Sequence, residues 1–402
     1  MRRLIAVMLL VMVCFCSCTS DAATQTSSSS SKADKPSSVA SKVESTEVSS
    51  KEPVVPAVND YSERTYNVID ILDYLKLDGR YRTRKDVYGK ITGVTMDNAY
   101  NCIAFNVDCE GDIVIDLDAK LYNAQGEGYR DLYFTVYIDG VRQEGRASVE
   151  GGMMVEKSAQ LTVATGLSKG KHSIEVYRQN ESNCGGVLLK SITMKGVPTE
   201  KPKDRDLLIE FVGDSITAGY GSLAIGSVEN PSNPKHSDAT STYAFVAAKE
   251  LNADITAICR SGHMFSGTNP LFKDFYGEIN WIRDRGHTYT ATRHPDVVVI
   301  SLGTNDASHA DISTITDYTV KALEVVRAAH PDAKIVWAYG QMGSSIAGKI
   351  KQGVEQFGGE AKGVYYCEMD TDYSGGGGHP SIAGHKKNGE ILVNFLKTKG
   401  LV

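Results

Sequence analysis

The stretch LLIEFVGDSITAGYG, residues 207–221, decides how the second half of the chain is interpreted. Its first seven residues are almost all apolar, and a short continuous apolar run is typical of a buried strand. The polar residues GDS follow at once, so Ser215 lies at the carboxyl end of the expected strand. In parallel sheets covered by helices, ligands bind at the carboxyl ends of the strands. The stretch therefore predicts an α/β domain whose chemistry lies at one edge of its sheet.

Strand-like runs and helical patterns alternate after this stretch, through residue 402. The further expected strands are ADITAIC, PDVVVISLG, AKIVWAYG and GVYYCEM. The expected helices are STYAFVAAKELN, ISTITDYTVKALEVVRAAH, GKIKQGVEQFG and a last helix from Ser381. Because strands that alternate with helices pair in parallel, we expect an α/β domain over residues 207–402, with helices on both faces of a parallel sheet.

A different period governs the part of the chain before this domain. Six short runs rich in Val, Ile, Tyr and Phe follow one another without a helical pattern between them: NCIAFNVDC, GDIVIDLDA, LYFTVYIDG, AQLTVATGL, HSIEVYRQ and GVLLKSITM. Turn signals such as EGD, IDG and SKGK separate the runs. The pattern predicts an all-β sandwich domain over residues 61–200, and the polar segment KPKDRD separates it from the α/β domain.

The first sixty residues have no globular pattern. Two arginines precede an apolar run that is too short for a comfortable membrane span and fits a secretory signal. Cys18 resembles the acylated cysteine of a bacterial lipoprotein, which would make residues 1–18 the signal peptide; cleavage near Ala22 or Ala23 is the alternative. Residues 19–60 are rich in Ser, Thr, Lys and Glu and predict a disordered tether. We expect an extracellular protein, lipid-anchored at a bacterial cell surface or released.

Composition argues against several classes of function. The 402 residues carry a formal net charge of −6, which gives no reason to expect nucleic acid as a partner. Five cysteines follow the tether, no two of them at metal-site spacing, and no HExxH motif occurs. We therefore expect neither a metal nor an organic cofactor. We also expect a monomer whose membrane contact is confined to the lipid anchor.

Four segments bring candidate catalytic groups to the same sheet edge. Ser215 follows the first strand, Gly262 the second and Asn305 the third, and His379 lies after the fifth strand in GGGGHPSIAGH. A serine hydroxyl becomes an effective nucleophile when an imidazole takes its proton. The oxyanion of acyl transfer needs preorganised donors, which the backbone N–H groups of Ser215 and Gly262 and the amide of Asn305 can supply. The segments together predict a serine hydrolase site.

The blocks GDSITAGYG, the SG of CRSGH, GTND and GGHPSIAGH resemble those of the SGNH (GDSL-type) hydrolases. A sandwich ahead of such a domain resembles, more narrowly, carbohydrate esterase family two, whose members deacetylate plant polysaccharides. The resemblance implies a flavodoxin-like, three-layer SGNH domain preceded by a jelly-roll-like sandwich. It also implies that Ser215 is the nucleophile, His379 the base, and Gly262 and Asn305 the oxyanion donors.

One position departs from the family pattern. SGNH hydrolases usually carry Asp three residues before the histidine, and here that residue is Gly376. The family includes Ser–His dyads in which a backbone carbonyl orients the ring, and we favour this arrangement, because a glycine-rich loop can turn a carbonyl toward Nδ1 of His379. Asp370 or Asp372 could instead reach back to the ring, although neither has the family spacing.

Three further residues are candidates for substrate binding. Trp281 lies in the long segment between the second and third strands, where its ring could stack on a sugar. Tyr339 and Gln341 close the fourth strand. We expect a secreted acetyl esterase that acts on acetylated xylan or glucomannan through an acetyl-serine. A lipase- or thioesterase-like hydrolase is one alternative, and a carbohydrate-binding surface protein without catalysis is another.

Overall fold

The structure, a computed structural model, describes residues 60–121, 131–149, 156–226, 228–267, 272–279 and 287–402. The predicted signal peptide, the lipidation of Cys18 and the tether concern residues outside this part. Within the described residues, no helix is long and apolar enough to cross a membrane. All of them belong to one compact unit, so the predicted domain limits, 61–200 and 207–402, stay predictions.

The described residues after position 206 hold a five-stranded parallel sheet in the order β12-β11-β13-β14-β15. Its strands are β11 Leu207–Gly213, β12 Ala253–Cys259, β13 Val297–Ser301, β14 Lys334–Tyr339 and β15 Val364–Glu368. Nearly every residue of β11, β12 and β13 is buried, as the continuous apolar runs predicted. Because β11 lies between β12 and β13, the strand order reverses there, and a site is expected beyond the carboxyl ends of these strands.

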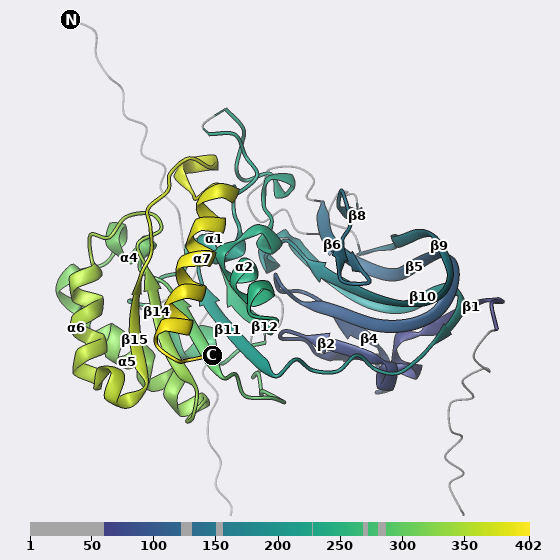
Figure 1. Ribbon diagram of the computed structural model, residues 1–402, viewed down its shortest axis with the longest axis horizontal. Coiled ribbons are helices and arrows are strands. Elements are labelled where there is room, and N and C mark those ends of the chain that lie inside the picture. Colours follow the sequence, from purple (N-terminus) through teal and green to yellow (C-terminus); the bar gives the residue numbers. More distant parts are fainter. Residues whose placement is uncertain (1–59, 122–130, 150–155, 227, 268–271, 280–286) are drawn as a thin grey trace, which may run out of the picture. The chain divides into compact units, whose positions relative to one another are not determined.

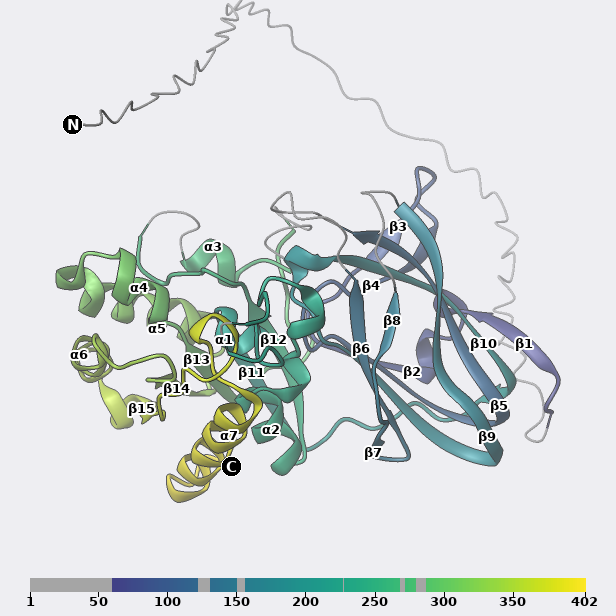
Figure 2. The same ribbon diagram turned by 90° about the horizontal axis from the view of Figure 1, so that it is seen from above.

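Helices cover both faces of this sheet, and Figure 2 shows α2 and α7 on one side and α3, α5 and α6 on the other. The helices are α1 Ser215–Ala218, α2 Tyr243–Glu250, α3 Phe272–Tyr276, α4 Thr304–His309, α5 Ile315–Ala329, α6 Ala347–Phe357 and α7 Ile382–Thr398. Successive strand residues serve opposite faces: Phe211 packs in one core with Leu392 of α7, and Val212 packs in another with Leu323 of α5. The flavodoxin-like three-layer fold is confirmed.

Short 3-10 helices punctuate both halves of the chain. They are η1 Val68–Asp70, η2 Leu72–Tyr74, η3 Ser182–Cys184, η4 Pro234–His236, η5 Ala239–Ser241, η6 Ile312–Thr314, η7 Gly359–Lys362 and η8 Gly376–Gly378. Single turns of this kind commonly connect longer elements. Two of them, η3 and η8, lie next to residues of the candidate site.

The first half of the described chain is an antiparallel sheet of ten strands with its own apolar core, and Figure 1 shows the long strands β5, β9 and β10 curving side by side. The strands are β1 Glu63–Asn67, β2 Leu75–Asp78, β3 Thr83–Lys85, β4 Ile91–Thr95, β5 Cys102–Leu121, β6 Leu132–Ile138, β7 Val141–Arg142, β8 Ala147–Val149, β9 Glu156–Arg178 and β10 Gly185–Pro198. The path runs β3-β4-β10-β5-β9-β6-β7, with β1, β2 and β8 paired beside it. The predicted all-β domain ahead of the parallel sheet is confirmed.

Two of the predicted turns in this half are bends inside continuous strands. NCIAFNVDC and GDIVIDLDA belong to the single strand β5, and AQLTVATGL and HSIEVYRQ belong to β9. The expected turns EGD and SKGK contain Gly111 and Gly170, whose φ angles of +77° and +147° absorb the bend while the pairing of β5 with β9 shifts register. The third signal, IDG, is a true hairpin turn between β6 and β7, where Asp139 and Gly140 both have positive φ.

Buried charges join the β-rich half to the parallel sheet. Six side chains, here called the interface network, take part: Lys76, Arg80, Arg205, Glu210, Asp254 and Arg293. Asp254 near the start of β12 is bonded by Lys76 at 2.5 Å, Arg293 at 2.9 Å and Arg205 at 3.0 Å. Three cations around one carboxylate offset the cost of burying it.

Glu210, in the middle of β11, is the second centre of this network. Arg80, which is fully buried, donates to it at 2.9 Å, and the hydroxyl of Tyr276 donates at 2.5 Å. Burial alone would raise the pKa of Glu210, but Arg80, His330 and Tyr276 together lower that pKa to about 2. Glu210 is therefore ionised at any physiological pH, and its partner Arg80 comes from the β-rich half.

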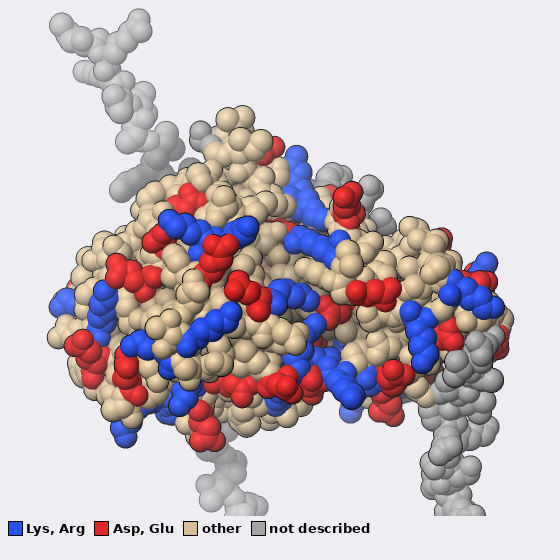
Figure 3. All heavy atoms as spheres, in the orientation of Figure 1, with Lys and Arg blue, Asp and Glu red and all other residues tan. Residues whose placement is uncertain are grey.

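Charge on the outside of the molecule is mixed. Figure 3 shows Lys and Arg side chains interspersed with Asp and Glu over the face in view, without a large area of one sign. This distribution agrees with the mild formal net charge of −6. A nucleic-acid-binding face would instead gather basic side chains.

Candidate active site

Ser215 is the first residue of α1 and directly follows β11. The carboxylate of Asp214 caps the helix by accepting a hydrogen bond from the N–H of Ile216 at 2.9 Å. Gly213 makes the turn possible, because a Cβ at that position would lie 2.0 Å from Oγ1 of Thr217. Gly219, with φ +72°, ends the helix after one turn. The local sequence thus holds the Ser215 hydroxyl at the carboxyl edge of the sheet.

His379 meets this hydroxyl from a distant part of the chain. Its Nε2 lies 2.8 Å from Oγ of Ser215. The ring of Tyr220 packs against the imidazole with 4.9 Å between centroids, and the Tyr220 hydroxyl is 2.9 Å from Oγ of Ser232. Burial lowers the pKa of His379, although the backbone carbonyls of Gly377 and Gly376 act in the opposite direction. The ring is therefore neutral near pH 7, the state in which Nε2 can accept a proton.

The other ring nitrogen has no carboxylate partner. Within the described residues, Nδ1 of His379 is buried and makes no hydrogen bond of good geometry. Asp372 accepts from Ser374 and Ser381 with its two oxygens; burial raises its pKa, but these bonds outweigh burial and lower that pKa to about 2. Asp370 pairs with a lysine of α7 at 2.5 Å. Both aspartates are therefore engaged away from the imidazole.

Position 376 has no room for an acidic side chain. A Cβ on Gly376 would lie 2.5 Å from Cβ of Ala224 and 3.0 Å from Cβ of Pro231. The N–H of Gly376 donates to the carbonyl of Gly221 at 2.9 Å, which fixes the loop before His379 against the loop after α1. The space of a side chain at this position is thus filled by the loop after α1.

Two backbone N–H groups at this edge of the sheet are candidates for an oxyanion hole. Among the hydrogen bonds of the described residues, none engages the N–H of Ser215 or of Gly262. Gly262 has φ +76°, and no atom lies within 4 Å of the position of its missing Cβ, so its face is open. The left-handed conformation explains why glycine is needed there. Both N–H groups are available to an oxyanion.

Asn305, at the start of α4, lies next to the same turn. Its Nδ2 donates to the carbonyl of His263 at 2.9 Å and approaches Oδ2 of Asp214 at 3.4 Å. The second contact is long for a hydrogen bond. The amide is therefore oriented by these two acceptors, and an oxyanion would share its hydrogens with them.

Two further titratable groups are buried around this edge. Burial, with a smaller contribution from the nearby Asp306, raises the pKa of Asp214 to about 7. Burial lowers the pKa of His263 to about 3; its ring stacks on Phe275 with 3.7 Å between centroids, and its Nε2 has no partner among the described residues. Asp306 accepts from the N–H and the hydroxyl of Ser266 at 2.8 and 2.5 Å. Asp306 thus supports the loop after Gly262, and His263 stays neutral.

The three predicted substrate-binding residues have different outcomes. Trp281 lies outside the described residues. Tyr339 is 3% exposed and packs under Gly303, and Gln341 is 1% exposed with its Nε2 3.4 Å from Oγ of Ser301. Both side chains are thus buried at the end of β14, and their role in substrate binding stays a prediction.

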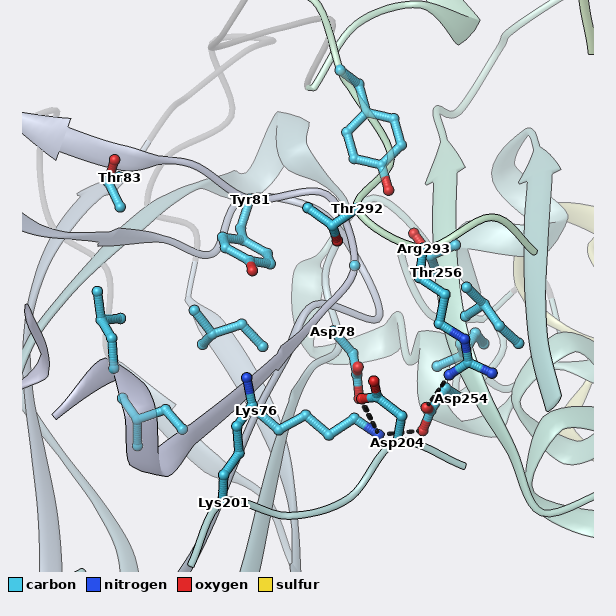
Figure 4. Close-up of a pocket in the computed structure, with 17 residues that line it drawn as sticks. Lys76, Asp78, Tyr81, Thr83, Lys201, Asp204, Asp254, Thr256, Thr292 and Arg293 are labelled. Carbon is cyan, nitrogen blue, oxygen red and sulfur yellow. Dashed lines mark hydrogen bonds and ion pairs between the residues drawn. The ribbon is translucent and has the colours of Figure 1, made fainter. Parts of the chain in front are cut away.

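A second polar cluster lies in a cavity of about 350 Å³ between the β-rich half and β12. Carboxylate oxygens of Asp78, Asp204 and Asp254 come within 4.8 Å of one another, a spacing that a metal ion could bridge. Figure 4 shows the Lys76 ammonium among these carboxylates, at 2.5 Å from Asp254 and 3.6 Å from each of the other two. Lys76 already supplies the positive charge that such a cluster requires.

The fold and the Ser–His pair together define a class. A family model described as GDSL-like lipase/acylhydrolase matches residues 211–387, a range that contains Ser215, Gly262, Asn305 and His379. The α/β half of this chain therefore resembles the GDSL-like hydrolases in its sequence as well as in its Ser–His pair.

Two curated proteins are similar to more than half of this chain. It is 31% identical, over 63% of its length, to the cellulase/esterase CelE of Acetivibrio thermocellus, and it spans about a third (34%) of that protein. It is 27% identical, over 58% of its length, to an acetylxylan esterase / glucomannan deacetylase of Cellvibrio japonicus, of which it covers 71%.

Solved structures give the same answer for the fold. The acetyl xylan esterase Est2A from Butyrivibrio proteoclasticus superposes with a TM-score of 0.72 at 20% identity, covering 84% of this chain and 99% of that one. A family two carbohydrate esterase from Clostridium thermocellum, solved with cellohexaose, superposes with a TM-score of 0.69 at 24% identity, covering 82% of this chain and 100% of that one. The chain therefore shares its fold with these esterases, and its residues 211–387 match the GDSL-like lipase/acylhydrolase family model.

The structure also shows site contacts that the sequence pattern did not identify. Tyr220, which packs against His379, lies within the GDSITAGYG block and could have been noticed there. Glu181, which bonds Ser261 beside Gly262, comes from the β-rich half and has no local signal.

Proposed function

We propose that this protein is an acetyl esterase that removes O-acetyl groups from plant polysaccharide with Ser215 as nucleophile and His379 as base. The observation that carries the proposal is the 2.8 Å contact between Oγ of Ser215 and Nε2 of His379. Two supports lie beside it: the open N–H groups of Ser215 and Gly262, and an imidazole whose pKa is lowered by burial. The likeness to an acetylxylan esterase / glucomannan deacetylase points to acetylated xylan or glucomannan as substrate.

The geometry supports a two-step acyl transfer. His379 takes the Ser215 proton at Nε2 as the oxygen attacks the acetyl carbonyl. The negative charge that develops on the carbonyl oxygen meets the N–H groups of Ser215 and Gly262, with the amide of Asn305 as a third donor. His379 then protonates the sugar oxygen as its bond to the acetyl carbon breaks, so that the sugar leaves as a hydroxyl and an acetyl-serine remains. Water deprotonated by His379 attacks this ester, and acetate and the free enzyme result.

A Ser–His dyad fits the surroundings of the histidine better than a triad does. Asp370 and Asp372 are bonded elsewhere, and a side chain at position 376 would clash with Ala224. The backbone carbonyls of Gly376 and Gly377 act on His379 in the direction that favours a protonated ring. A carbonyl dipole near Nδ1 would hold the proton on that nitrogen and leave Nε2 as the base. Such a dipole carries no full charge, so it stabilises the imidazolium less than a carboxylate would.

The place of action follows from the proposed substrate. Polysaccharides of plant cell walls lie outside cells, and the two relatives are named as a cellulase/esterase and as an acetylxylan esterase / glucomannan deacetylase. We therefore propose an extracellular enzyme, anchored through Cys18 or released. A monomeric state is part of the same proposal.

Esterase assays with matched acyl chains test the function directly. Hydrolysis of 4-nitrophenyl acetate, butyrate and decanoate would be compared with release of acetate from acetylated xylan, glucomannan and cello-oligosaccharides. The proposal expects preference for acetate and release from at least one polysaccharide, both absent in Ser215→Ala. Preference for decanoate would indicate a lipase-like hydrolase. Glycan binding without any turnover would indicate a binding protein.

A further inference from the structure

The loop that joins β9 to β10, residues 179–184, reaches from the β-rich half toward the candidate active site. Arg178, at the end of β9, is fully buried and donates to the carbonyls of Asn180 at 2.8 Å and Glu181 at 3.2 Å. The side chain of Asn180 donates to the carbonyl of Pro234 at 3.1 Å, which ties the loop to the α/β half. Because its polar groups are paired on both sides, this loop is a rigid support.

Glu181 projects from this support to the turn that follows β12. Its Oε2 accepts from the N–H of Ser261 at 2.8 Å, and its Oε1 accepts from the Ser261 hydroxyl at 2.5 Å. Glu181 is 5% exposed and Ser261 is half-buried, so both bonds are partly shielded from water. Hydrogen bonds to an ionised acceptor are shorter and stronger than neutral ones. Ser261 directly precedes Gly262, the proposed oxyanion donor.

The α/β half holds the same turn through two backbone bonds. The N–H of Arg260 donates to the carbonyl of Gly213 at 3.1 Å, and the N–H of His263 donates to the carbonyl of Arg260 at 3.1 Å. Gly262 lies between these anchors in a left-handed conformation with open space above it. A glycine has many backbone conformations available, so the direction of its N–H depends on how firmly the preceding residue is held.

We propose that Glu181 is a positioning residue for the oxyanion hole, contributed to the active site by the β-rich half. By fixing the N–H and the hydroxyl of Ser261, it sets the direction in which the N–H of Gly262 points. Donors act on the transition state when they are preorganised, and a displacement of about 1 Å can cost about 10² in rate. This inference rests on the proposed role of Ser215 as nucleophile, and it gives the sandwich a part in catalysis.

Reach and charge can be separated at this position. A carboxylate near the hole would oppose the negative charge of the oxyanion, so its value lies in accepting two hydrogen bonds. Glu181→Gln keeps the reach: its amide oxygen accepts from the N–H of Ser261, and its NH₂ donates to the hydroxyl after the hydroxyl turns. Glu181→Asp keeps the charge and loses one methylene of reach. A positioning role therefore predicts that Glu181→Gln keeps kcat and that Glu181→Asp lowers it.

The experiment measures kcat and KM for 4-nitrophenyl acetate with Glu181→Ala, Glu181→Asp and Glu181→Gln. We expect kcat to fall about 10²-fold in the Ala and Asp variants with KM nearly unchanged, because the donors act in the transition state. The Gln variant should stay within about threefold of wild type, because both bonds can be kept. A Gln variant as impaired as the Ala variant, or an Asp variant equal to wild type, would overturn the proposal.

Glu175→Ala is the matched control. This carboxylate also comes from β9 and joins the two halves, through Arg205 at 2.5 Å and Lys249 at 2.7 Å, without contact to the Ser261 turn. Its loss should lower the melting temperature and leave kcat within about twofold of wild type. If Glu175→Ala lowered kcat as much as Glu181→Ala, general docking of the halves would explain both results, and the proposal would fail.

Amide hydrogen exchange separates this inference from the proposed function. A peptide spanning residues 259–265 should exchange faster in Glu181→Ala than in wild type or Glu181→Gln, because the N–H of Ser261 loses its acceptor. An inactive wild-type protein would remove the proposed function, and exchange would still decide whether Glu181 holds the turn. Unchanged exchange in Glu181→Ala would overturn the inference even in an active enzyme.

Discussion

The interface network and the candidate active site use the same strands, β11 and β12, and treat buried polar groups in opposite ways. In the network, Glu210 faces Arg80 at 2.9 Å, and the other buried charges are likewise matched by partners of opposite sign. At the carboxyl edge, within the described residues, Nδ1 of His379 and Nε2 of His263 are buried without a partner, and the N–H of Gly262 is unengaged. Among the described residues, Nε of Arg80 in the network is also buried without an acceptor, so the two regions differ in whether a buried charge has a partner of opposite sign, and not in whether every polar atom is paired.

The difference between the two regions indicates that the interface network contributes to folding stability and that the candidate active site contributes to catalysis. A buried polar group that lacks a partner costs folding free energy, typically about 1–3 kcal/mol. Such groups are retained where a substrate or transition state supplies the missing partner. Mutations in the interface network should therefore lower the free energy of unfolding. Mutations in the candidate active site should instead lower kcat. Each prediction below tests this separation.

Ser215→Ala and His379→Ala carry the largest expected effect. Each should lower kcat for 4-nitrophenyl acetate by about 10⁴–10⁶, and the double variant should be no worse, because the two side chains act as a unit. Their melting temperatures should stay close to wild type, since neither side chain supports an ion pair. Near wild-type turnover in either variant would refute the assignment, and additive losses would argue against one shared proton transfer.

Arg80→Ala tests the interface network. Removing the guanidinium leaves Glu210 buried beside only neutral or weakly basic neighbours, which should cost about 3–5 kcal/mol of unfolding free energy. Unfolding in guanidinium chloride measures the loss of unfolding free energy. The kcat of the folded variant should not change. Arg293→Ala is the control, because this arginine is 31% exposed and Asp254 keeps Lys76 and Arg205; it should cost about 1 kcal/mol or less. A large fall in kcat with either variant would contradict the separation.

Asn305→Ala comes next, with an expected fall in kcat of about 10²–10³ if its amide is an oxyanion donor. The amide also bonds the carbonyl of His263, so a modest loss of stability should accompany the kinetic effect. Steady-state kinetics with 4-nitrophenyl acetate check this. A change confined to KM would move Asn305 to substrate binding and leave two backbone donors in the hole.

The positions of the candidate residues could be predicted because they depend on local periodicity. Ser215, Gly262 and Asn305 follow strands that the apolar runs mark clearly, and the carboxyl ends of parallel strands share one edge. His379 was placed there by the same rule, from a loop after the fifth strand. Distances, orientations and the second contacts of Asn305 depend on packing, which no pattern of residue types encodes.

The β-rich half was harder to predict in detail. A glycine between apolar runs marks a turn or a bulge equally well, so the sequence predicts turns at Gly111 and Gly170 where the structure has bends within β5 and β9. Glu181 could not be found, because it is 80 residues from Ser261 and in the other half of the chain. Contacts between halves depend on how two sheets pack, and this information is not periodic in the sequence.

The smallest expected effect on kcat is that of replacing the two aspartates near His379, Asp370 and Asp372. Asp372→Asn keeps the shape that Ser374 and Ser381 contact, and Asp370→Ala removes only an exposed pair with Lys387, so each should keep kcat within about tenfold. A true triad acid would behave differently, since its replacement costs about 10⁴ in kcat.

The pH profile gives a second readout for the same variants. Burial lowers the pKa of His379 below its ordinary value of 6.5, so the acidic limb of kcat/KM should lie below that pH, because the base must be neutral to act. A carboxylate bonded to Nδ1 would stabilise the imidazolium and raise this pKa; its removal would move the limb to lower pH. In a dyad held by backbone carbonyls, neither Asp372→Asn nor Asp370→Ala removes such a charge from the ring. An unmoved limb in both variants therefore supports the dyad, whereas a downward shift together with a large loss of kcat in one of them would identify that aspartate as the acid.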